Sequence, residues 1–179
     1  VAQVDARSGR FRQINKKYCE LVGYSEEEML NLTSRDITHP EDLELDRQQR
    51  RDLVAGTIAE FTVEKRYLHK NGQAVWTMVN TVLLRDTKNQ PLHFFTHIQD
   101  ITPRKQMEEA IKQREKQLSK NKELSDAFNG GMEALRNKQW DAAATHLSKA
   151  AELDPKQHVV WAQLAEAYNG QAQSKTGEE

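Results

Sequence analysis

Cysteine is almost absent from this chain, since Cys19 is the only one among 179 residues. A single cysteine cannot form an intramolecular disulfide, which excludes the disulfide-rich secreted scaffolds and fits a reducing compartment. Long apolar runs are also missing, because no segment approaches the roughly 18 apolar residues of a membrane-spanning helix. The start of the chain has neither the basic nor the apolar region of a signal peptide. These absences predict a cytoplasmic protein with no membrane partner.

The chain also has no excess of charge of either sign. Its 26 Lys and Arg residues nearly balance 27 Asp and Glu residues, for a net charge of -1 at pH 7. Without a positive field, nucleic acid is not an expected partner. The sequence has no glycine-rich phosphate loop, no His/Cys cluster at metal-ligand spacing and no nucleophile beside a base. We therefore predict that the chain is not an enzyme and has no metal site.

What the chain does contain, in its N-terminal part, is a succession of strand and helix patterns. Alternation and flanking turn residues predict five strands, over residues 1–5, 11–15, 61–69, 75–84 and 92–99. Helical spacing and capping signals predict three helices between the second and third strands, over residues 16–22, 25–30 and about 40–54. An antiparallel five-stranded sheet with short helices on one face is an α+β fold.

The third predicted helix is mostly charged. Its few apolar anchors are Leu43, Leu45 and Leu53, so we expect it to lie on the surface. His39 precedes this helix, and a structural hydrogen bond explains it better than a metal contact.

Several short motifs occur together in about residues 1–104. They are Gly9, Asn15, the run Leu21-Val22-Gly23-Tyr24-Ser25-Glu26-Glu27, the turn His39-Pro40-Glu41-Asp42, Glu64, Arg66, Lys70-Asn71-Gly72, Trp76, Arg85-Asp86 and Asp100-Ile101-Thr102. As a set they resemble the PAS family of sensors (PAS/PAC, S-box type), which implies a PAS sensor domain over residues 1–102.

The resemblance implies a pocket between the inner face of the sheet and the short helices. Its expected lining is Tyr18, Leu21, Phe61, Val63, Tyr67, Thr77, Val79, Thr81, Phe94, Thr96 and Ile98. Lys65 falls on the same face of the sheet. The hydroxyl groups in this set could hold a small-molecule ligand, or they could bond to each other and to the backbone in an ordinary core. Both alternatives stay open.

Two cofactors of similar sensors are disfavoured. Flavin-binding photosensors of the superfamily carry a reactive cysteine in an Asn-Cys-Arg-Phe motif on a later helix, whereas Cys19 lies in an early one. Haem sensors of the family usually take a histidine from the long helix, and residues 43–54 contain none. The sequence therefore assigns no cofactor.

The outer face of the predicted sheet is apolar as well. The residues that fall on it include Trp76, Met78, Val82 and Phe95. A half-solvated antiparallel sheet normally carries polar residues there, so this face predicts a contact. Because PAS domains often dimerise through this face, we expect a homodimer. The resemblance also implies that the signal leaves the sensor through Asp100, Ile101 and Thr102.

Residues 103–123 consist mostly of helix formers and predict a helical linker. Thr102 is the expected N-cap, with Pro103 at the first helical position. A helix continuing to about residue 137 would be roughly 50 Å long. Apolar residues such as Met107, Ile111 and Leu118 predict a weak coiled coil that polar residues interrupt. The alternative is a single solvated helix.

Residues 124–170 carry a second pattern, that of paired helices. The matching residues are Gly131, Trp140, Ala143, Leu147, Ala150, Pro155, Trp161, Leu164, Ala165 and Tyr168. This resembles one and a half tetratricopeptide repeats (TPR), although Lys138 stands where that family prefers glycine. The implied groove for an unidentified protein or peptide is lined by Phe128, Met132, Leu135, Arg136, Gln163 and Glu166. Residues 171–179 predict a polar tail.

Together these patterns predict a PAS sensor coupled through a helix to an all-α TPR docking hairpin, in a cytoplasmic signalling protein. One alternative is a PAS regulatory fragment of a sensor histidine kinase or diguanylate cyclase. The repeat stands where a catalytic domain would otherwise begin, which argues against that alternative. Another is a ligand-free PAS dimerisation scaffold that presents TPR surfaces in pairs.

Overall fold

The computed structural model describes residues 1–176. The chain divides into two compact units, Val1–Glu108 and Glu109–Glu179. Helix α4 (Thr102–Arg136) is a single helix that contributes residues to both units, as predicted. Among residues 1–176, no helix combines the length and the apolar character needed to cross a membrane.

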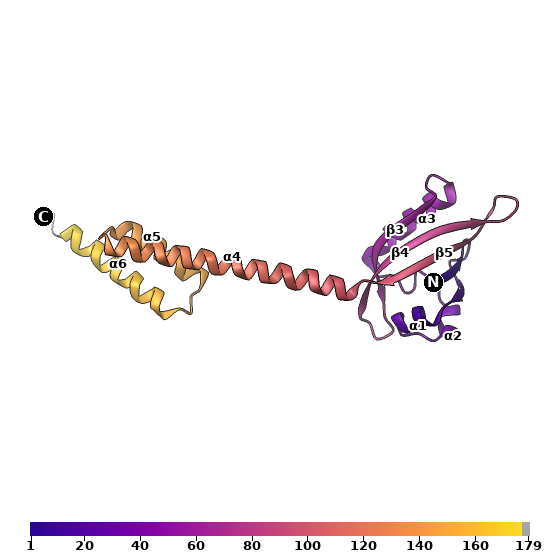
Figure 1. Cartoon of the computed structure of the whole chain (residues 1–179), viewed down its shortest axis with the longest axis horizontal. Helices are drawn as coiled ribbons and strands as arrows, with labels where there is room; N and C mark the ends of the chain where they lie inside the picture. Colours follow the sequence, from indigo (N-terminus) through magenta and orange to yellow (C-terminus); the bar gives the residue numbers. More distant parts are fainter. Residues whose placement is uncertain (177–179) are drawn as a thin grey trace. The chain divides into compact units, whose positions relative to one another are not determined.

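The N-terminal unit is built on one antiparallel sheet (Figure 1). Its strands are β1 (Ala2–Asp5), β2 (Phe11–Ile14), β3 (Glu60–Leu68), β4 (Ala74–Arg85) and β5 (Pro91–Asp100). The order across the sheet is β2-β1-β5-β4-β3. The last strand, β5, therefore lies between β1 and β4. It joins the N-terminal pair of strands, β1 and β2, to the later pair, β3 and β4. All five predicted strands are present, with ends shifted by one or two residues.

Short helices follow β2 and are fixed by local capping. They are α1 (Lys16–Val22), α2 (Glu26–Leu30), the 3-10 turn η1 (Pro40–Asp42) and α3 (Leu43–Ala55). Ser25 and Glu28 form a capping box at the start of α2. Gly23 ends α1 with φ of 74°, a left-handed conformation that glycine adopts without steric cost. His39 makes a structural hydrogen bond, because its Nδ1 accepts the Glu41 amide at 3.3 Å.

One face of the sheet forms the core together with these helices. Side chains from β3, β4 and β5 alternate between buried and more exposed positions. Tyr18 and Val22 of α1, Met29 of α2 and Leu53 of α3 belong to the same cluster of buried side chains as the inward residues of the strands. The helices thus cover the inner face of the sheet.

The prediction that α3 is a surface helix anchored by three leucines was wrong in part. Leu53 is buried, but Leu45 is 47% exposed. The buried residue of the central turns is instead Asp46, which is 7% exposed. A carboxylate is buried because cations lie beside it in the folded chain, and these partners are not visible in the helix pattern alone.

The C-terminal unit is helical. It contains the later part of α4 together with α5 (Trp140–Leu153) and α6 (His158–Thr176). Alanines 143, 144, 150 and 151 pack with Leu147, Val160 and Leu164 in its core. The turn between α4 and α5 holds Lys138 at φ of 57°, a left-handed conformation that favours glycine. Helix α6 continues through 171–176, where we predicted a polar tail, because this stretch contains mainly helix formers. The last part of that predicted tail, 177–179, lies outside the described residues.

Glycine allows the close approach of α4 and α5. A methyl group placed on Gly131 would lie 2.5 Å from Cγ of Leu147, which is shorter than any normal carbon contact. The adjacent Gly130 has more room, since its nearest neighbour would be Nδ1 of the exposed His146 at 3.2 Å.

The two glycines therefore give a matched test of this packing. We expect Gly131→Ala to destabilise the C-terminal unit by about 1–3 kcal/mol, because the methyl group overpacks Leu147. Gly130→Ala should be neutral or stabilising by up to about 1 kcal/mol, since alanine favours helix and the His146 ring can move. Hydrogen exchange of the α5 amides measures both effects. Equal protection in the two variants would contradict the close packing at Gly131.

Candidate functional site

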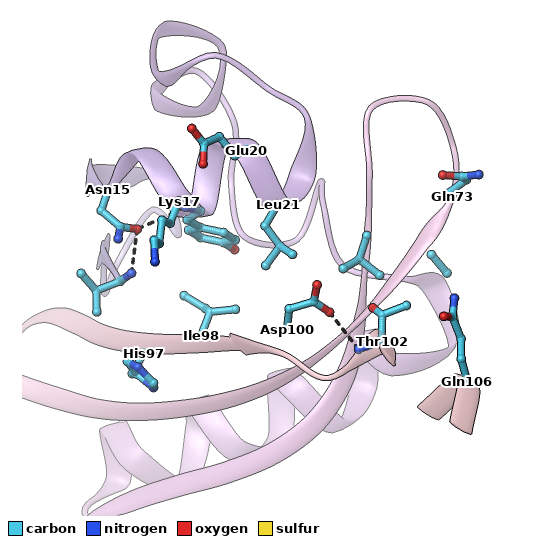
Figure 2. A pocket seen from close by; sticks show the side chains of 14 residues that line it. Asn15, Lys17, Glu20, Leu21, Gln73, His97, Ile98, Asp100, Thr102 and Gln106 are labelled. Carbon is cyan, nitrogen blue, oxygen red and sulfur yellow. Dashed lines mark hydrogen bonds between the residues drawn. The ribbon is translucent and has the colours of Figure 1, made fainter. Parts of the chain in front are cut away.

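A cavity of about 960 Å³ opens between α1 and the end of β5 in the N-terminal unit (Figure 2). Its volume is within the range of small-molecule sites. The residues that line it are Val1, Asn15, Lys17, Tyr18, Glu20, Leu21, Gln73, Ala74, Val75, His97, Ile98, Asp100, Thr102 and Gln106. It therefore combines part of the predicted ligand pocket with two residues of the predicted output segment.

The walls of this cavity offer both apolar and polar contacts. Leu21 of α1 and Ile98 of β5 point into the space between these two elements (Figure 2). Amide and charged side chains surround them, including Gln73, Lys17 and Glu20. Such a lining can bind a small polar molecule by hydrogen bonds and exclude water from its apolar part.

The output segment is tied to β4 by backbone hydrogen bonds at the edge of this cavity. The Ile101 amide donates to the Trp76 carbonyl at 2.9 Å, and Ile101 is buried. The Trp76 amide donates to the Thr102 hydroxyl at 3.0 Å, and that hydroxyl also lies 3.3 Å from the Trp76 carbonyl. Asp100 accepts the Thr102 amide at 2.8 Å. The first residue of α4 is thus fixed to the sheet.

The expected role of Thr102 as a helix N-cap was wrong. Thr102 is the first residue of α4, and its side chain bonds to the backbone of Trp76 instead. The reason is tertiary: β4 begins beside the start of the helix, so the Trp76 backbone competes for this hydroxyl.

Ion pairs on the outer side of β3 hold the first turn of α4. Glu64 accepts from Lys105 at 2.8 Å and also pairs with Arg104. Hydrogen bonds from Lys105 and then Arg104 lower the pKa of the Glu64 carboxyl from its ordinary value. The Trp76 ring lies 5.2 Å from the Arg66 guanidinium and 5.3 Å from the Lys105 ammonium. These contacts are partly exposed to solvent, so each contributes modestly.

Most of the predicted pocket residues form packed core. Tyr18, Leu21 and Ile98 line the cavity of Figure 2. The remaining core members are Phe61, Val63, Tyr67, Thr77, Val79, Thr81, Phe94 and Thr96. Their threonine hydroxyls are satisfied internally: Thr77 donates to the Lys65 carbonyl at 2.9 Å, and Thr81 and Thr96 bond each other at 3.2 Å. Burial, with a contribution from Tyr67, raises the pKa of the Tyr18 hydroxyl.

The sequence analysis missed a buried ion cluster in this core. Lys65 is 1% exposed and pairs with Asp46, which also accepts from Nε of Arg50 at 2.8 Å. Burial alone would raise the pKa of Asp46, but the Lys65 and Arg50 charges outweigh it and the pKa is lowered. The available signal was a lysine on an inward strand position together with an Asp and an Arg four residues apart on a helix.

The residues predicted to form a dimer surface lie on the outer sheet face. Met78 and Val82 are half-buried, and Phe95 is 38% exposed. Trp76 is also half-buried, and its ring is already covered in part by Arg66 and Lys105.

The residues predicted for a TPR groove differ in exposure. Leu135 is buried in the helical core, and Phe128 and Met132 pack against it. Arg136 and Glu166 are exposed, and Gln163 is half-buried. Leu135 is therefore a packing residue in this unit.

No group of three or more His, Cys, Asp or Glu side chains is placed to hold a metal ion within residues 1–176. Cys19 is buried, and desolvation raises the pKa of its thiol, which disfavours the nucleophilic thiolate.

Comparison with known proteins identifies the N-terminal unit. Residues 11–96 match the model of the PAS fold family. The crystal structure of a PAS domain from Colwellia psychrerythraea superimposes with a TM-score of 0.52 at 27% identity, over 57% of this chain and 86% of that one. This unit is therefore a PAS domain, as its sequence motifs indicated.

Two curated signalling proteins contain similar segments. The chain is 41% identical over 105 residues to the probable diguanylate cyclase DgcE of Escherichia coli (strain K12), covering 59% of this chain and 10% of DgcE. It is 28% identical over 109 residues to the sensor histidine kinase TmoS of Ectopseudomonas mendocina, covering 61% of this chain and 11% of TmoS. The chain thus spans about a tenth of the length of these relatives.

The buried ion cluster gives a test with a matched control on the same helix. Asp46→Asn should reduce the free energy of unfolding of the N-terminal unit by about 3–5 kcal/mol, because it leaves two buried cations without a counter-charge. Glu44 also bridges two cations, Arg47 and Arg51, but it is exposed. Glu44→Gln should therefore cost less than about 1 kcal/mol.

The effect of Asp46→Asn should depend on pH in a defined direction. Because the pKa of Asp46 is lowered in the folded state, its stabilisation is complete above the ordinary value of about 3.9 and is lost as the pH falls through the folded value. Urea unfolding followed by hydrogen exchange of β4 measures this. A difference in the free energy of unfolding between wild type and Asp46→Asn that does not shrink below about pH 4 would contradict the role of the Asp46 carboxylate as counter-charge.

Proposed function

We propose that the PAS domain is a sensory input domain that regulates the output of a signalling protein through α4. The observation that carries this proposal is the junction, where a ligand-sized cavity is lined by Thr102, the first residue of α4, and by Asp100, which accepts the Thr102 amide. A molecule in the cavity would contact the residues that hold the helix to the sheet. Its binding could then shift α4 relative to β4, provided that the molecule binds more tightly when α4 is in one position than when it is in the other.

The relatives favour regulation of an enzyme over TPR docking as the output. Both curated matches carry names of signalling enzymes, a diguanylate cyclase and a histidine kinase, and the chain aligns with about a tenth of each. We therefore propose that this PAS domain acts as a regulatory region of the kind those enzymes contain. This was the alternative, and not the principal prediction, of the sequence analysis.

The proposal can be tested by placing the PAS domain in an enzyme with a measurable output. In full-length DgcE, the segment that this chain matches would be replaced by residues 1–108. We expect Thr102→Val to change the cyclase activity of this chimera at least about 5-fold, the lower end of typical coupling energies, because both bonds to Trp76 are lost. Thr102→Ser keeps the hydroxyl and should stay within about 2-fold of the unsubstituted chimera. Equal activities in folded chimeras would overturn the proposal.

A second candidate function is protein interaction through the helical unit. Its support is the apolar surface of α6, where Val159 is 62%, Trp161 48% and Tyr168 52% exposed. One and a half repeats do not bury their own faces, and about three are usually needed. We propose that this surface of α6 contacts a further repeat or another protein, as expected for a TPR.

A homodimer would support either function. We propose that it forms through Phe95 and its neighbours on the outer sheet face and through exposed apolar residues of α4, among them Leu118, which is 60% exposed. Such patches usually mark contacts. A dimer that binds no ligand would correspond to the alternative of a ligand-free PAS dimerisation scaffold.

Sedimentation velocity separates these surfaces. We expect the chain to sediment as a dimer, and Phe95→Glu or Leu118→Glu to shift it to monomer, because a charge would be buried in the interface. Leu45→Glu, at an apolar residue of similar exposure on α3, is the matched control and should remain dimeric. Trp161→Glu should also remain dimeric if α6 is reserved for another partner. A monomeric wild-type chain would rule out the dimer.

A further inference from the structure

A second cavity in the PAS domain has an unusual concentration of arginine. It has a volume of about 730 Å³ and lies among the β1–β2 turn, the segment 33–35, α3 and Phe94 of β5. Five arginines line it, Arg7, Arg35, Arg47, Arg50 and Arg51. Among the described residues, Asp46 is the one carboxylate in this lining, and it is already paired.

The ion cluster beside this cavity carries uncompensated positive charge. Lys65 and Arg50 share the single carboxylate of Asp46, which leaves one positive charge in excess inside the domain. The Arg50 guanidinium is 4.7 Å from the centre of the Phe94 ring, and this contact offsets only part of its desolvation. A buried charge without a counter-ion is costly, so the site favours an anion.

Arg50 also has an unused buried donor. Its Nε donates to Asp46, but Nη1 is buried and has no hydrogen-bond partner among residues 1–176. Buried polar groups in folded proteins are nearly always bonded. This unpaired donor adds to the uncompensated positive charge of the cluster, which an oxyanion near Arg50 would offset.

Two further arginines stand at the mouth of the cavity. Arg47 and Arg51 lie 3.1 Å from the same Glu44 carboxylate and are about half exposed. Each guanidinium has five N–H donors, so one shared carboxylate leaves most of them available. Their planar forks match carboxylate and phosphate groups.

Part of the remaining wall is apolar. Leu43 and Val54 of α3, Ala6 beside β1 and Phe94 of β5 line the same cavity. A bare inorganic anion would leave this surface unused, whereas an organic anion could place its charged group on the arginines and its body against these side chains. The volume also fits a small organic molecule.

We propose that this cavity binds a small organic anion, with a carboxylate or phosphate group held by Arg50 and Arg47 and an apolar part against Phe94 and Val54. The anion neutralises the excess charge of the ion cluster. This cavity shares no lining residue with the one that borders Asp100 and Thr102, so the inference adds a second ligand site to the PAS domain and goes beyond the proposed function.

Calorimetric titration of the whole 179-residue chain at low salt tests the proposal. The probes are phenyl phosphate and benzoate, each with an anionic group and a ring, together with inorganic phosphate and benzyl alcohol. We expect at least one of the two ring anions to bind at least about 10-fold more tightly than either inorganic phosphate or benzyl alcohol. The stronger of the two distinguishes a phosphate from a carboxylate ligand. Binding of neither ring anion, or equal binding of inorganic phosphate, would overturn the proposal.

Substitutions locate the bound anion. Arg47→Gln and Arg35→Gln change exposed side chains, so both variants should fold. We expect Arg47→Gln to weaken binding of the better probe about 10-fold or more, through the loss of charged hydrogen bonds, and Arg35→Gln to weaken it to a smaller extent. Arg50→Lys keeps the charge but removes the fork, and should weaken binding at least as much as Arg47→Gln. Arg114→Gln, the same change at an exposed position of the other unit, is the matched control and should have no effect. Unchanged affinity in Arg47→Gln and Arg50→Lys would reject the site.

The test of anion binding and the test of the sensory function in the DgcE chimera have independent outcomes. Absence of anion binding, with a DgcE chimera that still responds to Thr102→Val, would reject the ligand class and leave the sensory function standing. Anion binding to a domain whose chimera does not respond to Thr102→Val would support the anion site and reject the sensory function.

Discussion

The position of β5 is the constraint on which the N-terminal unit depends. This strand is hydrogen-bonded on both edges, to β1 and to β4, so Thr96 lies opposite Ala2 on one side and Thr81 on the other. A shift of one residue would turn Phe94 and Thr96 out of the core, because side chains alternate along a strand. The same register places the end of β5 beside Trp76 and thereby fixes where α4 begins. The cavity, the junction and the core all follow from this pairing.

Charge inside the domain explains how a polar helix covers the sheet. Lys65 faces inward from β3 and requires a counter-charge, which α3 supplies through Asp46. Arg50, one turn later on α3, binds the same carboxylate. Ion pairs of this kind add little net stability when compared with apolar packing, but they penalise every arrangement that separates the partners. The cluster therefore fixes α3 on the sheet and leaves a positive excess at the arginine-lined cavity.

Packing of small residues, and not charge, organises the helical unit. Gly131 lets α4 approach Leu147 of α5, and a methyl group on Gly170 of α6 would lie 2.3 Å from the Trp140 ring. Alanines fill most of the remaining core. The larger apolar side chains of α6 are left on the surface, so the part of this unit that could recognise a partner is distinct from the part that holds it together.

Local signals in the sequence determined the five strands, the caps of α1 and α2, the single helix α4 and the inward positions of β3 to β5, because each depends on residues a few positions apart. The sequence did not reveal the burial of Asp46, the bond of Thr102 to Trp76 or the arginine-lined cavity. Asp46 and Lys65 are 19 residues apart, and Thr102 and Trp76 are 26 apart. Arg7, Arg35 and Arg50 come from three separate segments. Only the folded chain brings such groups together, since their contacts depend on the pairing of distant strands and leave no period in the sequence.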